Sequence, residues 1–152
     1  MTTGIVHIGV GGFHRAHEAA YLDRLMRRRA GAGPHDGAEP TTPGGSCLEW
    51  GICGVGLLPE DARMRDALES QDHLYTLIRK HPGGLCDPAV IGSIHDYRLA
   101  SDAPEEVLAL LSAPTTRIVS LTLTWDGYNI DDTTGEFRTF APGAVHDAEH
   151  PG

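Results

Sequence analysis

The segment IVHIGVGGFHRAH, residues 5–17, constrains the fold of this 152-residue chain more than any other feature. Residues 5–9 form a short apolar run that predicts a buried strand. From 14 to 29, apolar residues recur at the spacing of one helix face. Gly9 and Gly11 lie between the two patterns. The segment therefore predicts a strand, a tight glycine turn and a helix in direct succession.

The spacing Gly9-x-Gly11 begins like a dinucleotide-binding fingerprint. In that fingerprint the first glycine permits the tight turn and the second lets the backbone approach a pyrophosphate at the start of a helix. The third small residue, which allows the helix to pack closely on the strand, is replaced here by His14. On spacing alone, a cofactor turn and a purely structural turn both stay open.

The rest of the chain predicts further strands and helices. These are strands at 50–56 and 117–124, helices at 59–70 and 103–113, and two strands at 73–80 and 89–94 that form a hairpin. Ser101 or Asp102 is available as the N-cap of the second of these helices. We therefore expect one α/β domain over 1–152, with a mostly parallel sheet, helices on both faces and an added β-hairpin.

Acidic residues follow the strand at 50–56. In dinucleotide-binding folds an acidic residue after the second strand receives the ribose hydroxyls of NAD, and Glu60 and Asp61 lie a few residues beyond that point. The alternative is that they are acids of the first helical turn. Arg63 and Arg65 are close enough to receive a 2′-phosphate, which keeps NADP open as the cofactor.

Three histidines lie in or near the glycine turn. His14 and His17 are three residues apart on the predicted helix, with Glu18 beside them, but no third ligand has a convincing spacing. We therefore expect no metal site and interpret these side chains as polar groups near the phosphates. His7 lies inside an apolar strand, which favours a hydrogen-bonded core histidine over a catalyst.

Charge and composition exclude several classes of protein. The formal charge of −9 argues against nucleic acid or an anionic membrane as a partner. No apolar run approaches the ~20 residues needed to cross a bilayer, and the first residues lack a secretory signal. The three cysteines form no C-x-x-C pair, which favours reduced thiols. A cytoplasmic protein is the expectation.

Common catalytic signatures are missing from the sequence. Lys80 is the only lysine, and no tyrosine precedes it by four residues, so a Tyr-x-x-x-Lys reductase is excluded. Neither a Gly-x-Ser-x-Gly elbow nor a Gly-Lys-Ser/Thr phosphate loop occurs, which removes the common hydrolase and NTPase motifs. The sequence therefore offers no candidate catalytic residue.

Six segments in order resemble the N-terminal half of the mannitol dehydrogenase family, the long-chain polyol-specific dehydrogenases. These segments are IVHIGVGGFHRAH, WGICGVGLLPED, QDHLYTLI, IGSI, RIVSLTLTWDGYN and TGEF. The resemblance covers nearly the whole chain. In that family the form Gly-x-Gly-x-Phe-His-Arg-x-His is normal for the turn, so Phe13 and His14 become part of the pattern. The resemblance implies a cofactor turn where spacing left the question open.

By resemblance, the chain is a Rossmann-like domain that binds NAD, with NADP as an alternative. The cofactor-binding residues implied are Gly9, Val10, Gly11, Gly12, Phe13 and His14 at the pyrophosphate, Glu60 or Asp61 at the adenosine ribose, and Thr122 and Thr124 on the nicotinamide side. The family transfers hydride between the cofactor and a polyol or keto sugar, of the mannitol–fructose or hexuronate type. A mostly helical second domain holds the polyol.

Two departures from the family pattern limit what is implied. After Thr124 the family usually has Glu-Gly-Gly-Tyr, whereas Trp125 and Asp126 stand here at the first two of those positions. The family's catalytic lysine, asparagine and histidine belong to the second domain, so the isolated chain is expected to be inactive. Activity then needs that C-terminal domain as a partner. The alternative is a non-catalytic nucleotide-binding or interaction module that self-associates through exposed apolar surface.

Overall fold

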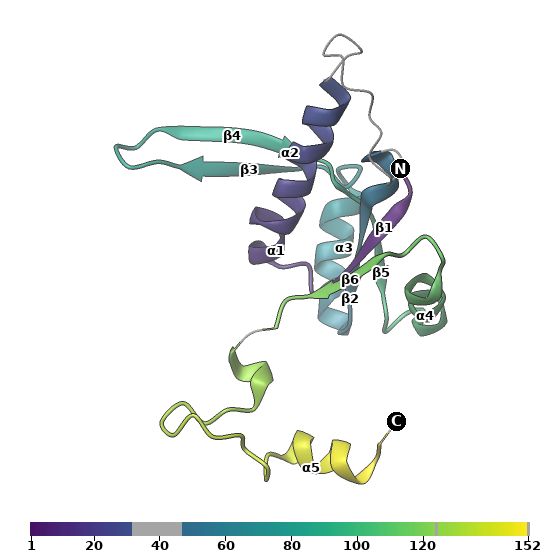
Figure 1. Ribbon diagram of the computed structural model, residues 1–152, viewed down its shortest axis with the longest axis vertical. Coiled ribbons are helices and arrows are strands. Elements are labelled where there is room, and N and C mark those ends of the chain that lie inside the picture. Colours follow the sequence, from purple (N-terminus) through teal and green to yellow (C-terminus); the bar gives the residue numbers. More distant parts are fainter. Residues whose placement is uncertain (32–46, 124, 152) are drawn as a thin grey trace. The chain divides into compact units, whose positions relative to one another are not determined.

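The computed structural model describes residues 1–31, 47–123 and 125–151. The chain divides into two units, Met1–Thr122 and Leu123–Gly152. In the first unit, four strands form a sheet: β1 (Thr3–Ile8), β2 (Gly51–Gly56), β5 (Ile94–Leu99) and β6 (Ile118–Leu121). Their spatial order is β5-β2-β1-β6 and every neighbouring pair is parallel (Figure 1). The predicted parallel sheet is confirmed, and β2 is buried at all its positions.

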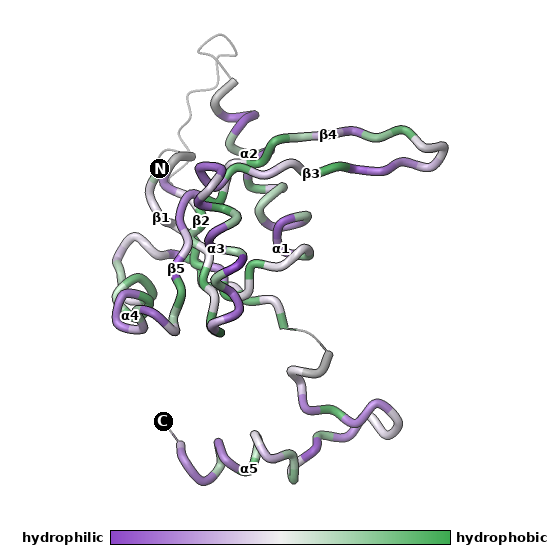
Figure 2. Tube along the Cα trace, turned by 180° about the vertical axis from the view of Figure 1, so that it is seen from behind, coloured by the Kyte–Doolittle hydropathy of each residue, from purple (hydrophilic) through white to green (hydrophobic). Residues whose placement is uncertain are grey.

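Helices cover both faces of this sheet, as predicted. They are α1 (Gly12–Ala16), α2 (Glu18–Gly31), α3 (Ala62–Glu69) and α4 (Pro104–Ser112), with short 3-10 turns at Cys47–Trp50 and Pro59–Asp61. Successive side chains of a strand point to opposite faces. Ile5 of β1 therefore joins one core cluster with residues of α2 and α3, and Val6 joins another with Val107 of α4. Green and purple stretches of α4 in Figure 2 show its apolar and polar residues.

The helix expected over 14–29 is interrupted at His17. The backbone there has φ −116° and ψ −87°, which is not helical, and α2 begins at Glu18. The imidazole Nδ1 of His17 lies 2.8 Å from the carbonyl oxygen of Phe13, inside α1. The glycine turn is thus followed by a one-turn helix and then by a second helix that starts afresh.

The predicted hairpin is confirmed, but one of its strands ends early. β3 (Tyr75–Lys80) and β4 (Cys86–Ile91) pair antiparallel in a sheet of their own. The strand expected over 89–94 divides because Gly92 and Ser93 bond to α2: the Gly92 N–H donates to Asp23 Oδ1 at 2.9 Å, and the Ser93 hydroxyl donates to the Ala19 carbonyl at 2.7 Å. After this break, β5 enters the parallel sheet, a strand that the sequence pattern did not indicate.

The N-cap expected for α4 is wrong. Ala103 holds the N-cap position, and no side chain of the described residues caps the helix. Asp102 instead accepts a hydrogen bond from Arg65 at 2.7 Å, across to α3. Its carboxylate therefore joins two helices rather than ending one.

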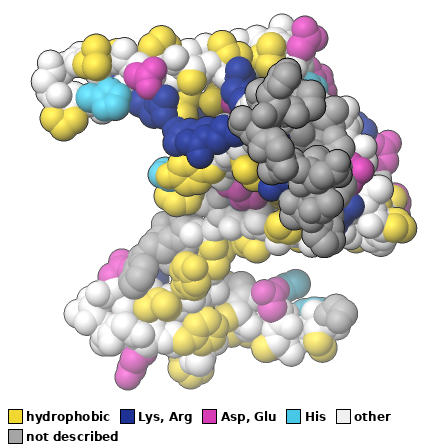
Figure 3. Space-filling model, turned by 45° about the horizontal axis from the view of Figure 1, so that its top comes forward, with side chains coloured by type: hydrophobic (Ala, Val, Ile, Leu, Met, Phe, Trp, Pro, Cys, Tyr) yellow, Lys and Arg dark blue, Asp and Glu magenta, His cyan; other side chains and the backbone are white. Residues whose placement is uncertain are grey.

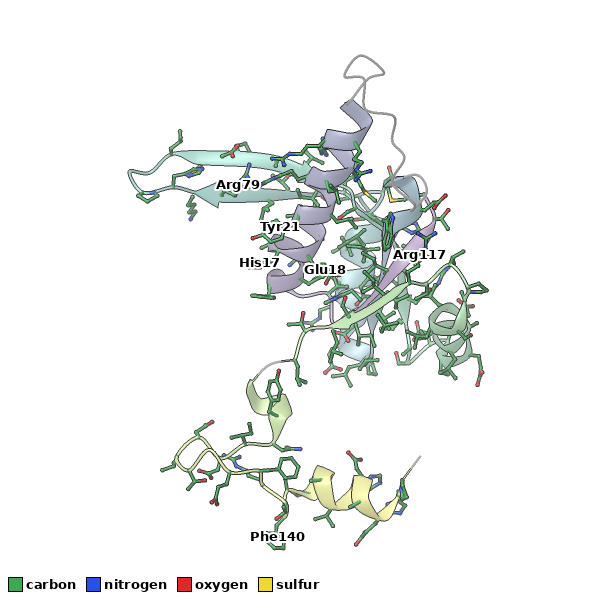
Figure 4. The ribbon with its side chains drawn as sticks, in the orientation of Figure 1. His17, Glu18, Tyr21, Arg79, Arg117 and Phe140 are labelled. Carbon is green, nitrogen blue, oxygen red and sulfur yellow. The ribbon has the colours of Figure 1, made fainter. Side chains whose placement is uncertain are left out.

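The second unit is small and largely exposed. It contains a 3-10 turn at Trp125–Tyr128, an isolated bridge between Ile130 and Phe137, and α5 (Pro142–Glu149), which the sequence pattern did not indicate. Phe140, labelled in Figure 4, is 91% exposed. Among the helices in the described ranges, none combines the length and the apolar character needed to cross a membrane.

Gly54 lets the glycine turn pack directly on β2. A Cβ at this position would lie 2.5 Å from Val10 Cγ2 and 2.9 Å from Tyr97 Cδ2. We expect Gly54→Ala to lower the free energy of unfolding by about 1–3 kcal/mol, because an added methyl forces packed neighbours apart. Urea denaturation measures the change. Gly143→Ala is the control, since a Cβ there meets nothing within 4 Å, and equal stability of the two variants would contradict the packing argument.

Candidate functional site

The direction of the strand order reverses between β1 and β6. From β1 the chain builds outward through β2 and β5, and then β6 is added on the other side of β1. In open α/β sheets ligands bind at the carboxyl ends of the strands beside such a reversal. The residues at this point are Gly9, which follows β1, and Thr122, which follows β6. A Cβ on Gly9 would lie 3.9 Å from the Thr122 carbonyl oxygen.

The glycine turn leaves open space and unused donors at this point. Gly9 has φ +86° and its N–H donates to the Val55 carbonyl at 2.9 Å, so it makes the tight turn. A Cβ at Gly11 or Gly12 would meet no atom within 4 Å. The backbone N–H groups of Gly12, Phe13 and His14 have no acceptor among the described residues. Free N–H groups beside unfilled space fit a bound phosphate group.

The other side chains of the turn lie in three different environments. Val10 is buried in the core against β2, and Phe13 is 66% exposed and stacked on His17 with a centroid distance of 4.3 Å. The His14 imidazole is fully buried and points into the protein. Of the predicted pyrophosphate residues, His14 therefore offers its backbone N–H to the open space over Gly11 and Gly12, whereas its side chain lies inside the protein. We call this space, at the carboxyl ends of β1 and β6, the crevice.

A buried polar cluster lies under the turn. His7 Nδ1 is 2.8 Å from Ser120 Oγ and 3.1 Å from Glu18 Oε2, and His7 Nε2 is 3.1 Å from Thr122 Oγ1. The His14 ring stacks on the His7 ring, with centroids 3.6 Å apart and planes 10° from parallel. Figure 4 shows Glu18 on the sheet side of its helix, opposite His17 and Tyr21. The prediction of a hydrogen-bonded core histidine at position 7 is confirmed.

Burial favours the neutral form of both imidazoles. Burial lowers the pKa of His7, and the nearby Glu18 carboxylate and a backbone hydrogen bond with Gly9 oppose that shift only in part. Burial lowers the pKa of His14 to about 3, and the charges of His7 and Arg15 act in the same direction. Among the described residues, neither ring nitrogen of His14 has a hydrogen-bond partner. Glu18 Oε2, at 3.9 Å from Nε2, is too far for a hydrogen bond.

His7, His14 and Glu18 place potential metal ligands within 4.8 Å of one another. The set differs from the one considered in the sequence, since His17 faces Phe13. A nitrogen lone pair lies in the plane of its ring, so two rings stacked in parallel cannot both aim at one ion. Both ring nitrogens of His7 are also engaged in hydrogen bonds, with Ser120 and Thr122. We interpret the cluster as a hydrogen-bond network.

The acidic residues after β2 have different surroundings. Asp61 Oδ2 accepts hydrogen bonds from the N–H groups of Leu57 and Leu58, at 2.9 and 3.0 Å, so this carboxylate orders the loop. Glu60 is exposed and makes no hydrogen bond or ion pair within the described chain. Arg65 pairs with Asp66 and Asp102, whereas Arg63 is exposed. Within the part of the chain that the structure describes, Glu60 and Arg63 therefore carry charges without an ion-pair partner near the end of β2.

Of the two threonines expected on the nicotinamide side, the structure describes Thr122. Thr122 is partly exposed, and its N–H donates to the Ile8 carbonyl at 3.3 Å, which fixes it at the end of β6. Thr124 lies outside the described residues. Thr122 and the glycine turn thus follow two neighbouring parallel strands at the same end of the sheet.

A groove of about 270 Å³ between α2 and the hairpin is a separate feature. Arg24, Arg27 and Arg79 line it, and basic side chains gather beside the hairpin in Figure 3. Arg27 pairs with Asp23 and Arg79 with Asp87, each at 2.6 Å. No residue of the glycine turn lines this groove, so it is not part of the crevice.

Comparison with known proteins gives one consistent result. Residues 3–144 match the family model described as mannitol dehydrogenase Rossmann domain. Mannitol 2-dehydrogenase of Neosartorya fischeri is 46% identical over 146 residues, which cover 96% of this chain and 26% of the relative. The Aspergillus fumigatus enzyme of the same name is 47% identical over the same length and coverage. The chain spans about a quarter of the length of these relatives.

Solved structures of similar proteins agree with this. The ternary complex of Pseudomonas fluorescens mannitol 2-dehydrogenase with NAD and D-mannitol superposes with a TM-score of 0.73 at 43% identity, covering 99% of this chain and 27% of that one. A substrate-free D-sorbitol dehydrogenase gives a TM-score of 0.72 at 37% identity, with 99% and 28% covered. The strand order and the glycine turn described above are thus found in a chain similar to polyol dehydrogenases.

Proposed function

Since this chain belongs to the mannitol dehydrogenase family, whose Rossmann domain it carries, we propose that it binds NAD as the cofactor-binding part of an oxidoreductase. The substrate class is a polyol and its keto sugar, of the mannitol–fructose or hexuronate type. The nicotinamide ring of bound NAD supplies the acceptor and donor of hydride. The single observation that carries the proposal is the open space over Gly11 and Gly12 beside unused backbone N–H groups.

In this proposal each part of the crevice binds one part of the dinucleotide. The N–H groups of Gly12, Phe13 and His14 receive the pyrophosphate, and Gly11 keeps the approach free. The acidic pair after β2 receives the adenosine ribose, with Glu60 as the free carboxylate and Asp61 as the residue that shapes its loop. Thr122, with Thr124, approaches the nicotinamide side. Gly9 contributes by making the tight turn with its backbone, and Val10 contributes by packing in the core.

NAD is the cofactor we favour over NADP. The exposed carboxylate of Glu60 would repel a 2′-phosphate, whereas it can accept hydrogen bonds from ribose hydroxyls. The Pseudomonas fluorescens relative was solved with NAD. The unpaired Arg63 is the feature that favours NADP, and a comparison of the two nucleotides decides between them.

We propose that the isolated chain binds cofactor without turning over polyol. Alcohol oxidation needs a group within hydrogen-bond reach of the hydroxyl proton, and the described crevice offers no such acid or base. His7 and His14 are buried, and burial favours their neutral forms. The matched relatives are about four times as long, so we assign catalysis and polyol binding to a further domain acting as partner. A cytoplasmic location fits the free thiols Cys53 and Cys86.

Titration of the purified chain with NADH and with NADPH tests the proposal. We expect saturable binding of NADH by calorimetry, with quenching of tryptophan fluorescence, and at least about tenfold weaker binding of NADPH, the effect of one unfavourable charge contact. A folded chain that binds neither nucleotide would contradict the proposed function. Preference for NADPH would move the ribose assignment from Glu60 to Arg63.

A further inference from the structure

A carboxylate, an imidazole and a hydroxyl form a line that ends at the crevice. Glu18 Oε2 lies 3.1 Å from His7 Nδ1, and His7 Nε2 lies 3.1 Å from Thr122 Oγ1. Glu18 is on α2, His7 on β1 and Thr122 beyond β6, so three elements meet in one hydrogen-bonded chain. Thr122 is the only member at the carboxyl end of a strand. The line therefore connects the buried cluster to the place where the dinucleotide is proposed to bind.

The contacts on the Nδ1 side determine which nitrogen of His7 carries hydrogen. The Ser120 hydroxyl lies 3.0 and 3.1 Å from the two oxygens of Glu18 and donates to that carboxylate. Its oxygen, 2.8 Å from His7 Nδ1, is then an acceptor, as is Glu18 Oε2. An unprotonated Nδ1 would face two acceptors with no hydrogen between them. The hydrogen of the neutral ring is therefore on Nδ1.

This tautomer fixes the hydroxyl of Thr122. With its hydrogen on Nδ1, His7 has an acceptor at Nε2, so the Thr122 O–H must donate to it. The lone pairs of Thr122 Oγ1 remain for a partner in the crevice. His14 holds the His7 ring in place by stacking at 3.6 Å and, with neither nitrogen bonded, does not compete for these hydrogens.

We propose that His7 is a positioning residue, held by Glu18 and Ser120, that makes Thr122 a hydrogen-bond acceptor for the nicotinamide half of the bound dinucleotide. The group it recognises is an N–H donor of the nicotinamide ring, its carboxamide. This inference rests on the proposed function, because it places the nicotinamide half beside Thr122. It adds the direction of the hydrogen bond and the residues that impose it.

The tautomer is measured directly by ¹⁵N NMR of the histidine rings in the uniformly labelled full chain. We expect a neutral His7 with hydrogen on Nδ1, which is the less common tautomer in solution. Hydrogen on Nε2 would overturn the inference whether or not the chain binds NADH. The Glu18→Gln variant turns the acceptor at Nδ1 into an amide able to donate, and we expect it to move the His7 hydrogen toward Nε2.

Binding is measured as the ratio of two affinities, for NADH and for ADP-ribose, which lacks the nicotinamide ring. Thr122→Val should lower the affinity for NADH about tenfold and leave ADP-ribose within twofold, the cost of one unmade hydrogen bond. Glu18→Gln should change the ratio in the same direction, because it reverses the Thr122 hydroxyl. Thr76→Val, at an exposed position of β3, is the control and should change neither affinity.

The outcomes separate this inference from the proposed function. NADH binding that Thr122→Val and Glu18→Gln both leave unchanged would overturn the role of His7 and Thr122 and leave the cofactor assignment standing. Equal losses for NADH and ADP-ribose would also overturn it, because they indicate general damage to the site. A wild-type chain that binds neither nucleotide would contradict the proposed function, and the inference would fail with it.

Discussion

The Gly11→Val variant is expected to bind NADH at least about 100-fold more weakly than the wild-type chain while keeping its fold. A Cβ at this position meets no protein atom within 4 Å, and the backbone, with φ −99° and ψ −173°, is extended and suits valine. The valine side chain would instead occupy the space over the turn. Loss of two hydrogen bonds from backbone N–H groups to a charged pyrophosphate costs about 3–6 kcal/mol.

Calorimetry measures the affinity, and thermal unfolding without nucleotide measures the fold. The variant should lose at most about 1 kcal/mol of stability, since valine is a poorer N-cap than glycine. Gly143→Val is the matched control, because it adds the same side chain at another glycine with open space around it. Wild-type affinity in Gly11→Val would show that the dinucleotide does not lie over the turn.

Acid should destabilise this chain through His14 by about 1.4 kcal/mol for each pH unit below about 6.5. The ordinary histidine pKa of 6.5 applies in the unfolded chain, whereas burial lowers the folded pKa to about 3. Between these two values the unfolded state binds a proton that the folded state does not. The free energy of unfolding is therefore not reduced by His14 above pH 6.5, and it falls as the pH decreases toward 3. The imidazoles of His7, which is buried, and His95, which is partly buried, also have lowered pKa values and act in the same direction.

His14→Phe isolates this effect in urea denaturation between pH 7.5 and 4.5. The phenyl ring can keep the stack on His7 and cannot be protonated, so the slope of stability against pH should decrease by about one proton. At pH 7 the variant should be as stable as the wild type or more so, because two unpaired buried nitrogens are removed. His81→Gln, at an exposed position beyond β3, is the control. An unchanged slope in His14→Phe would contradict the assignment.

Elements with a strong local pattern were predictable from the sequence. The turn between β1 and α1 follows from Gly9 and Gly11, and β2 from its unbroken apolar run. β5 was missed because its residues do not alternate regularly. Its strand conformation comes from parallel pairing with β2 after Gly92 and Ser93 bond to α2. Asp102 was misassigned as a cap because its partner, Arg65, is 37 residues away.

The candidate site also contains residues that the sequence predicts and residues that it does not. The glycines of the turn were identified from their spacing and from the family pattern. The cluster around His7 was not, because its partners Ser120 and Thr122 are brought to it by the pairing of β1 with β6. The available signal was that His7 and Ser120 take matching positions on neighbouring strands, with Glu18 four residues after His14. These matching positions can be recognised only when the strand order is known.

The pairing of β1 with β6 also has a consequence for when the site forms. His7 and Thr122 are 115 residues apart, so the crevice joins the beginning of the first unit to its end. Contacts this distant in sequence form late and slowly in folding. During synthesis the glycine turn is made early, but its neighbour in the folded site, Thr122, is made much later. Dinucleotide binding would therefore report completed folding of the whole first unit, and would stabilise that unit as a whole by mass action.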